Sequence, residues 1–378
     1  MKKILFLFIV ILSIVIISSK TDKIKEDQDK QELRGIYISY IEISKYLKDK
    51  NEQESKLNIK KMIDNTESMN CNTIILQVRP SNDAIYYSKI FPISKYLSDD
   101  NTYPFDVLKY FIEESKKKKI KIIAWINPYR VSTTEDLSEE NPAYQYINTD
   151  NIYINNGIYY NPSKEETTNI IISGVEEVLN YDISGILFDD YFYPNDEIDI
   201  NDYNNNSKSE TLEEYHLKVV NSMIERVHNK CKEKNIPCGV APEGHIDNNY
   251  HKNYADVKRW LETDNYIDFI APQIYYGFHN SSKPFVDTIN EWVDKKKKKK
   301  INLYISLAFY KTGKFDNYAG LGNEEWINNN DIIMKEIIYS RTRREYKGFI
   351  LYRYDSIFDI ADNKQSKQEK KNLKTILK

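Results

Sequence analysis

The sequence has little of what marks several common protein classes. Its 378 residues include only three Cys, which allow one disulfide at most and exclude a disulfide scaffold. There are five His and no His-x-His or Cys-x-x-Cys pair, so we expect no zinc finger, no His-rich metal hydrolase, no metal and no cofactor. The chain also lacks an excess of one charge, because it contains 54 Lys and Arg and 57 Asp and Glu. Nucleic-acid binders usually carry a basic excess, so no nucleic-acid partner is expected.

Long apolar runs are scarce too, and the one at the N-terminus indicates targeting rather than fold. Met1–Lys3 is positive, and Ile4–Ile17 is an apolar stretch of 14 residues with one Ser. It fits a secretory signal and is short of the ~20 residues that a membrane span needs. The cleavage site is weak, so residues 1–19 are expected to be a signal peptide or an N-terminal membrane anchor. Residues 20–33 are expected to be a linker, and the rest to be secreted or extracytoplasmic, with anchoring through residues 4–17 left open.

The sequence does contain a regular alternation of strand-like and helix-like segments. Eight short β-rich apolar runs recur, at Gly35–Tyr40, Thr73–Arg79, Lys121–Asn127, Gly185–Tyr191, Cys238–Glu243, Phe269–Tyr275, Leu303–Tyr310 and Gly348–Tyr354. Most are separated by stretches with apolar residues at i, i+3 and i+4. This alternation predicts an α/β fold, a TIM (β/α)8 barrel over residues 34–361. The Lys-rich residues 362–378 are expected to be a marginal final helix or a frayed end.

The connections between these segments are uneven in length. Lys116–Lys119 leads directly into the third strand, whereas about 25 residues follow the second strand before the next helix. A working barrel has long βα loops, because its site lies at the C-terminal ends of the strands. We therefore expect the site at that face, and the Lys runs at the opposite one.

Polar residues end several of the predicted strands on one face. Strands turn alternate residues to opposite faces, and helices cover the outside of a barrel, so this polar set must point into the barrel mouth. The set comes from five strands: Gln77 and Arg79; Trp125, Asn127 and Tyr129; Glu243; Gln273 and Tyr275; and Tyr310. Five strands that end in this way predict a site for a polar ligand.

The fourth strand ends in two adjacent carboxylates, Asp189 and Asp190. Alternation places Asp189 and Tyr191 inward, and such a pair is costly unless it is paired or used. Glu243 ends the next strand, and two carboxylates on neighbouring strands can divide the roles of glycoside hydrolysis. Asp189, Asp190 and Glu243 are the candidate catalytic residues, with Asp190 as partner or orienter of Asp189. The candidate substrate-binding residues are Gln77, Arg79, Trp125, Asn127, Tyr129, Tyr191, His245, Gln273, Tyr275, Tyr276 and Tyr310.

Six motifs that occur in order at the strand ends resemble the family 10-like glycosyl hydrolases. They are Arg34–Tyr37, Gln77–Pro80 with Tyr86–Ser88, Ala124–Arg130, Tyr159–Pro162, Phe188–Pro194 and Ala271–Tyr275. The resemblance implies a TIM-type barrel, a secreted or envelope location and action on glycans, with bacterial cell-wall strands as the substrate of some members. Ser184 departs from the Asp that is usual in the family. The fifth strand departs as well, so the role of Glu243 is inferred from spacing alone.

Two functions of different classes follow from these features. The first is a secreted or surface-anchored glycosidase that cleaves O-glycosidic bonds of a polysaccharide, such as the glycan strand of peptidoglycan. The second is a non-catalytic glycan-binding barrel of the cell envelope. The carboxylates favour the first. A metal-dependent deacetylase would need clustered ligands, and no two His are spaced as ligands. The sugar, the linkage, the stereochemical outcome and the oligomeric state are left open.

Overall fold

The computed structural model describes residues 32–189, 192–206, 209–298, 300–360 and 363–378. The predicted signal peptide or anchor and most of the predicted linker lie outside this part of the chain. Within the described part, no helix is both long enough and apolar enough to cross a membrane.

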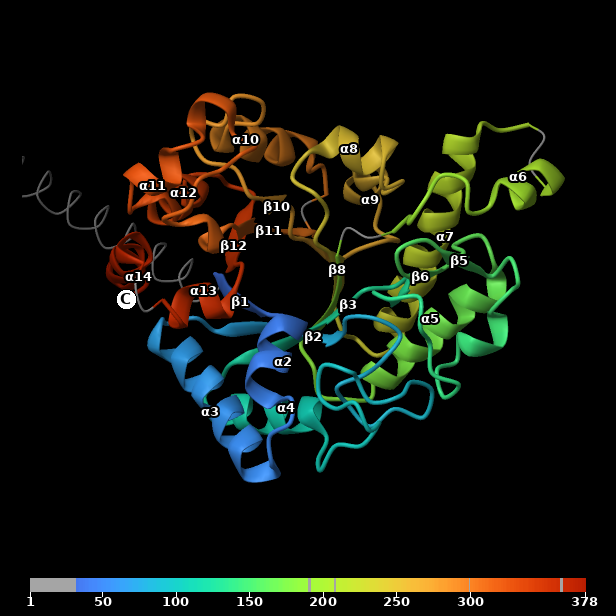
Figure 1. The fold of residues 1–378 in the computed structure, drawn as a ribbon. Helices are drawn as coiled ribbons and strands as arrows, with labels where there is room; N and C mark the ends of the chain where they lie inside the picture. Colours follow the sequence, from blue (N-terminus) through green and yellow to red (C-terminus); the bar gives the residue numbers. More distant parts are fainter. Residues whose placement is uncertain (1–31, 190–191, 207–208, 299, 361–362) are drawn as a thin grey trace, which may run out of the picture.

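Parallel strands form a closed ring at the centre of the molecule (Figure 1). In ring order they are β1 (Leu33–Ile38), β2 (Thr73–Arg79), β3 (Lys121–Ile126), β7 (Gly185–Phe188), β8 (Cys238–Val240), β9 (Phe269–Ile270) with its continuation β10 (Gln273–Ile274), β11 (Asn302–Leu307) and β12 (Tyr346–Leu351). β12 pairs with β1, and β9 pairs with both β8 and β11, which closes the sheet. The predicted eight-stranded TIM barrel is confirmed.

Helices surround this ring (Figure 1). They are α2 (Tyr40–Leu47), α3 (Glu52–Ser68), α4 (Val107–Lys117), α5 (Glu165–Val178), α6 (Ile200–Asn206), α7 (Leu212–Glu233), α8 (Ile246–His251), α9 (Val257–Glu262), α10 (Phe285–Lys295), α11 (Glu325–Asn328), α12 (Ile332–Arg341), α13 (Tyr354–Phe358) and α14 (Lys364–Ile376), with 3-10 turns η1 (Tyr144–Tyr146), η2 (Phe309–Lys311) and η3 (Gly320–Gly322). Local sequence sets several helix starts. Ser39 and Glu42 form a capping box at α2, and Thr211 and Glu214 form another at α7.

The strands separate two cores. Tyr37, Ile75, Trp125, Leu187 and Ile350 belong to a small cluster inside the barrel. The residues that alternate with them belong to a much larger core between the strands and the helices. Since this alternation holds up to the ends of most strands, it also decides which side chains reach the barrel mouth.

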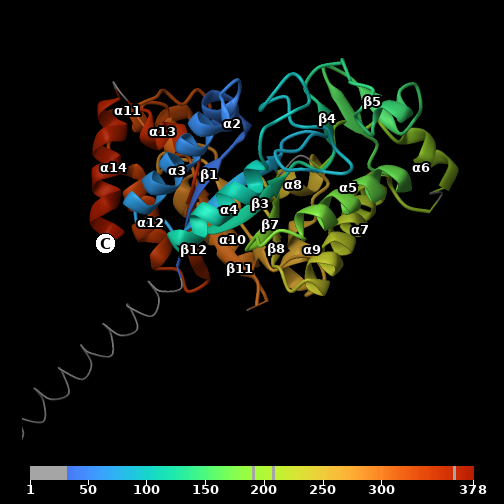
Figure 2. The ribbon, with the colours of Figure 1, turned by 90° about the horizontal axis from the view of Figure 1, so that it is seen from below.

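The long loop after β3 contains a small antiparallel sheet that the sequence analysis did not predict. Its strands are β4 (Arg130–Ser132), β5 (Ile152–Ile154) and β6 (Ile158–Tyr160), paired in the order β4-β6-β5. Strands of three residues are too short for periodicity to reveal. Figure 2 shows β4 and β5 at the same end of the barrel as α2, which follows β1, so this end carries long βα loops as predicted.

The fold begins slightly earlier than predicted. Glu32 is buried, and its carboxylate pairs at 2.8 Å with the guanidinium groups of both Arg34 and Arg341. The last two residues of the predicted linker, Glu32 and Leu33, therefore belong to the barrel.

Of the two expectations for the C-terminal tail, the structure contains the final helix and not the frayed end in the described residues, and this helix is not marginal. Helix α14 packs against α12, and Leu373 and Leu377 are fully buried. The backbone oxygen of Leu377 accepts hydrogen bonds from Arg34 and Asn70. The segment has few apolar residues, but they fall on one helix face and pack against the rest of the protein. Its Lys-rich composition alone therefore does not indicate that this helix belongs to the fold.

Candidate active site

A small cavity of about 80 Å³ lies at the C-terminal ends of the strands. It is lined by Tyr37, Trp125, Leu187, Asp189, Ala241, Gln273, Tyr275 and Tyr352. These residues lie in or directly after six of the barrel strands, so the barrel itself positions them. Trp125, Asp189, Gln273 and Tyr275 were predicted to meet here, and the structure brings these four together.

Asp189 supplies the carboxylate of this cavity. It follows directly after β7 and is only 4% exposed. Its Oδ2 accepts a hydrogen bond of 3.1 Å from the indole nitrogen of Trp125 on β3. A buried carboxylate is costly unless its charge is stabilised, and a charge-assisted hydrogen bond provides part of that stabilisation.

Aromatic rings surround the carboxylate. Tyr37 packs edge-on against both Trp125 and Tyr352, with ring centroids 5.5 Å apart in each pair. Tyr275 contacts Tyr352 at 5.7 Å, and Tyr310 contacts Tyr275 at 5.9 Å. Burial raises the pKa of Tyr310 to about 12, so this phenol keeps its proton at neutral pH. The mouth therefore offers aromatic surface and neutral hydroxyl groups around one carboxylate.

Gln77 and Asn127 form a buried amide pair. Gln77 Nε2 donates to Asn127 Oδ1 at 2.8 Å, and Gln77 Oε1 accepts from the backbone N–H of Tyr40 at 2.9 Å. The Nδ2 of Asn127 is buried and has no hydrogen-bond partner in the described part of the chain. Gln77 pairs in register with Trp125, which lines the cavity, but neither Gln77 nor Asn127 lines it. The two amides therefore lie beside the cavity and orient each other.

Glu243 lies next to the cavity but does not line it. It forms a bridge with Gln273, which does line the cavity. Its Oε1 accepts a hydrogen bond of 2.7 Å from Asn248. Burial, and then the Glu243 carboxylate, raise the pKa of Tyr276 to about 12. Glu243, Tyr276 and His245 thus belong to the region around the start of α8, of which His245 is the N-cap residue.

Arg79 does not reach the cavity, which corrects the prediction. The pairing of β2 with β3 shifts register between Gln77 and Arg79, so Arg79 pairs with Ile126 of the outer core. The guanidinium group stacks 3.8 Å from the ring centroid of Phe91 and is fully buried. A Cβ at Gly174 on α5 would lie 2.1 Å from its Nη1, so the glycine makes room for it. The extra residue in the strand reverses the alternation on which the prediction depended.

Tyr129 is also misplaced by the prediction. It is 1% exposed and belongs to the outer core, and burial raises its pKa. Its ring is therefore not available for stacking on a sugar. It lies beyond the end of β3, where the chain turns into β4, so the alternation of the strand no longer applies. Asp190 and Tyr191 lie outside the described residues.

Two aromatic residues of the cavity, Tyr37 and Tyr352, are not among the predicted site residues. Tyr37 lies on β1, and its hydroxyl is 3.0 Å from the hydroxyl of Ser306 on β11. Tyr352 directly follows β12. The sequence signal for both is alternation along the first and last strands, which places Tyr37 and Tyr352 on the inner face with Ile350.

The arrangement suits a polar ring-shaped ligand. The cavity is far smaller than the roughly 300–1,000 Å³ of a drug-sized site, so it can receive only one edge of a sugar ring. A cavity of about 520 Å³ lies elsewhere, beside α7 and α9. We place the site at the mouth, because active sites of TIM barrels form at the C-terminal ends of the strands.

Comparison with known proteins gives matches over most of the chain. The family model described as glycosyl hydrolase-like 10 matches residues 32–320. Glycosyl hydrolase YngK of Bacillus subtilis (strain 168) is 29% identical over 318 residues, which cover 75% of this chain but only 62% of that protein. Glycosyl hydrolase DigH of Escherichia coli (strain K12) is 28% identical over 332 residues, covering 78% of this chain and 74% of that protein.

A solved structure has the same fold. The PgaB (BpsB) glycoside hydrolase domain from Bordetella bronchiseptica superposes with a TM-score of 0.59 and covers 90% of this chain and 99% of that chain. Its sequence identity to this chain is 10%, so this likeness concerns the fold alone.

Proposed function

Because the chain belongs to the glycosyl hydrolase-like 10 family, we propose that it hydrolyses O-glycosidic bonds of a polysaccharide, with Asp189 as an essential carboxylate. One observation carries this proposal. Asp189 is buried at the barrel mouth, in a cavity lined by aromatic side chains, and accepts a hydrogen bond from Trp125. A desolvated carboxylate among rings that can stack on sugar faces is what the chemistry of a glycosidase needs.

The reaction requires two roles from acidic groups. One group protonates the leaving oxygen, and the other attacks the sugar or activates water. Asp189 takes one of these roles. We assign the second to Asp190, its neighbour in sequence, rather than to Glu243, whose carboxylate is bound by Asn248 beside the cavity. Gln273 is the amide that lines the cavity and is placed to hold a sugar hydroxyl.

The proposed substrate is a bacterial cell-wall glycan, such as the glycan strand of peptidoglycan. The family resemblance and the apolar N-terminal run support this assignment, because that run predicts work outside the cytoplasmic membrane. Residues 1–19 act in this proposal as a signal peptide or a membrane anchor.

Product analysis tests the proposed function. The purified protein is incubated separately with peptidoglycan glycan strands, chitin and mannan, and products are identified by mass spectrometry. We expect shortened oligosaccharides from the peptidoglycan strands. The Asp189→Asn variant controls for a contaminating activity, and Asp182→Asn, on an exposed Asp between α5 and β7, controls for the substitution itself. Products that persist with Asp189→Asn would contradict the proposal.

A non-catalytic glycan-binding barrel is the second candidate. The observation in its favour is that Asp189 is the only carboxylate among the described residues that line the cavity. This candidate predicts that wild-type protein binds the glycan strands and releases no products, a result that the same experiment separates from hydrolysis.

A further inference from the structure

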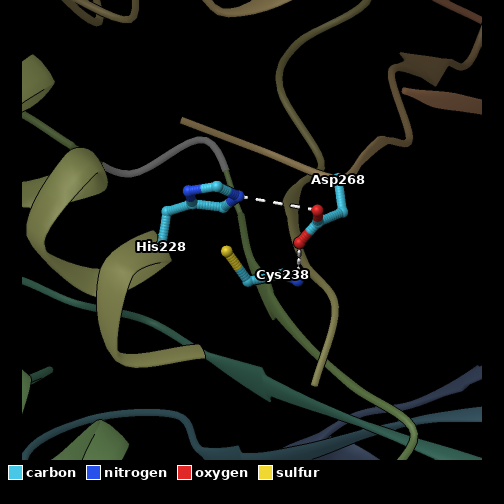
Figure 3. A group of neighbouring side chains, drawn as sticks. All are labelled: His228, Cys238 and Asp268. Atoms are coloured by element: carbon cyan, nitrogen blue, oxygen red, sulfur yellow. Dashed lines mark hydrogen bonds and ion pairs between the residues drawn. The ribbon is translucent and has the colours of Figure 1, made fainter. Parts of the chain in front are cut away.

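Three side chains with metal-binding atoms meet at the end of the barrel opposite the mouth. His228 lies near the end of α7, Cys238 begins β8, and Asp268 directly precedes β9 (Figure 3). Their potential ligand atoms all lie within 4.8 Å of one another. His228 and Cys238 are buried, at 5% and 4% exposure, whereas the Asp268 side chain is 48% exposed and leaves an entry path.

The spacing of His228 and Asp268 fits an ion pair and also fits two ligands of one metal ion. Nε2 of His228 is 3.5 Å from Oδ1 of Asp268. Zinc binds nitrogen and oxygen at about 2.0–2.1 Å, so two such ligands of a tetrahedral ion lie roughly 3.3–3.5 Å apart. The other oxygen of Asp268 accepts the backbone N–H of Cys238 at 2.9 Å, which orients the carboxylate toward His228.

The charges of the cluster also match a divalent ion. A thiolate, a carboxylate and a neutral imidazole together carry two negative charges, which Zn²⁺ neutralises, so burial of the complex is not opposed by net charge.

We propose that His228, Cys238 and Asp268 form a zinc site in which these three side chains are the protein ligands. Thiolate, imidazole and carboxylate are donors that zinc takes in proteins, and the fourth position of the tetrahedral ion is left for water. The site joins α7 to the starts of β8 and β9, at the face of a TIM barrel that contributes to stability rather than to catalysis. The ion links these three elements and takes no part in the reaction at the mouth.

No metal is expected from the sequence, because it contains no His-x-His or Cys-x-x-Cys pair. Here His228, Cys238 and Asp268 come from three separate segments of the chain. The barrel brings them together by pairing β8 with β9.

Metal titration of the full chain tests this proposal. The purified protein is treated with a chelator and dialysed. Separate samples are then titrated with Zn²⁺ and with Co²⁺, whose thiolate charge-transfer absorption reports a Cys ligand. We expect one ion per chain, a thiolate-to-cobalt band, and a higher thermal midpoint with Zn²⁺. Cys238→Ser and His228→Asn should each weaken zinc binding by at least ~100-fold, since loss of an outer partner alone costs 10–100-fold.

Cys71→Ser is the matched control, because Cys71 is a buried thiol outside the cluster. It should keep one ion per chain and the cobalt band. The wild-type stoichiometry and spectrum decide the question even if a variant fails to fold. A folded wild-type chain with free thiols that binds no ion would overturn the proposal. The proposal would also be overturned if the wild-type chain had a mass lower by two hydrogens, which would indicate a disulfide between Cys231 and Cys238.

Discussion

Asp189 occupies a position that is costly for a carboxylate. It is 4% exposed and surrounded by rings, and Trp125 donates to its Oδ2. Removal of a charge from water is unfavourable, and such positions are typical of functional sites rather than of stable cores. The same environment strengthens any interaction that the carboxylate makes with charge developing on a substrate.

The hydrogen bond from Trp125 can be removed without loss of the aromatic face. Trp125→Phe keeps a ring in the cavity and deletes the N–H that lies 3.1 Å from Asp189. A hydrogen bond to a charged group contributes about 1.5–3 kcal/mol, so we expect kcat/KM to fall by roughly 10- to 100-fold. Steady-state kinetics on the cleaved glycan measure this. An unchanged kcat/KM would mean that Trp125 does not position the carboxylate.

Glu243 should matter much less than Asp189. Its carboxylate accepts from Asn248 and does not line the cavity, and Glu243→Gln preserves an oxygen that can accept this hydrogen bond. We expect kcat to fall by less than about tenfold, below the roughly 10²–10⁴-fold of a lost acid or base. A loss as large as that of Asp189→Asn would return Glu243 to the role of second carboxylate.

At the scale of elements, strand alternation explains both the success and the failure of the site prediction. Alternation holds through β3 and β7, so Trp125 and Asp189 were placed correctly. It fails in β2, where the register shift turns Arg79 outward. A bulge of one residue leaves no mark in a pattern of polar and apolar residues, so the sequence alone could not show it.

Helix α14 shows a second limit of composition. Leu373 is fully buried on this Lys-rich helix, and Leu373→Ala should lower the free energy of unfolding by about 2–5 kcal/mol. Lys371→Ala, on the exposed face of the same helix, should change it by less than about 0.5 kcal/mol. Urea unfolding of both variants measures the difference. Equal effects would show that α14 contributes little to the fold.

The contact between α14 and α12 also makes stability depend on pH. Burial raises the pKa of Glu369 to about 8, and its Oε1 accepts the backbone N–H of Met334 at 2.8 Å. Burial, and then Glu369, raise the pKa of Glu336 as well. Glu369 loses its proton near pH 4.3 in the unfolded chain and near pH 8 in the folded chain. The stability that this proton contributes is therefore fully present below about pH 4.3 and is lost as the pH rises to about 8.

Glu369→Gln should weaken this dependence. The amide cannot ionise and can still accept from Met334, so one contribution of up to about 1.4 kcal/mol per pH unit disappears between pH 4.5 and 8. Thermal midpoints over this range, with Glu262→Gln at an exposed site as control, measure the slopes. A slope identical to that of the wild type would mean that Glu369 is ionised in the folded protein.

For the whole molecule, the fold was largely predictable and the site only partly so. Eight apolar runs at regular intervals predicted the barrel, because each strand and its helix are encoded locally. The convergence of Trp125, Asp189, Gln273 and Tyr275 followed from that topology. The proposed zinc site could not be predicted in this way, because its ligands meet only through pairing of distant segments. The two sites lie at opposite ends of the barrel, so stability and catalysis are expected to be separable.

The most direct measurement compares wild-type protein with Asp189→Asn for both binding and turnover of peptidoglycan glycan strands. The change keeps the shape of the side chain and removes its charge and its proton. We expect turnover to fall by roughly 10²–10⁴-fold or more, while glycan affinity and the melting temperature change little. Near-normal turnover by Asp189→Asn, in a preparation free of wild-type enzyme, would contradict the assignment of this barrel mouth as a glycosidase active site.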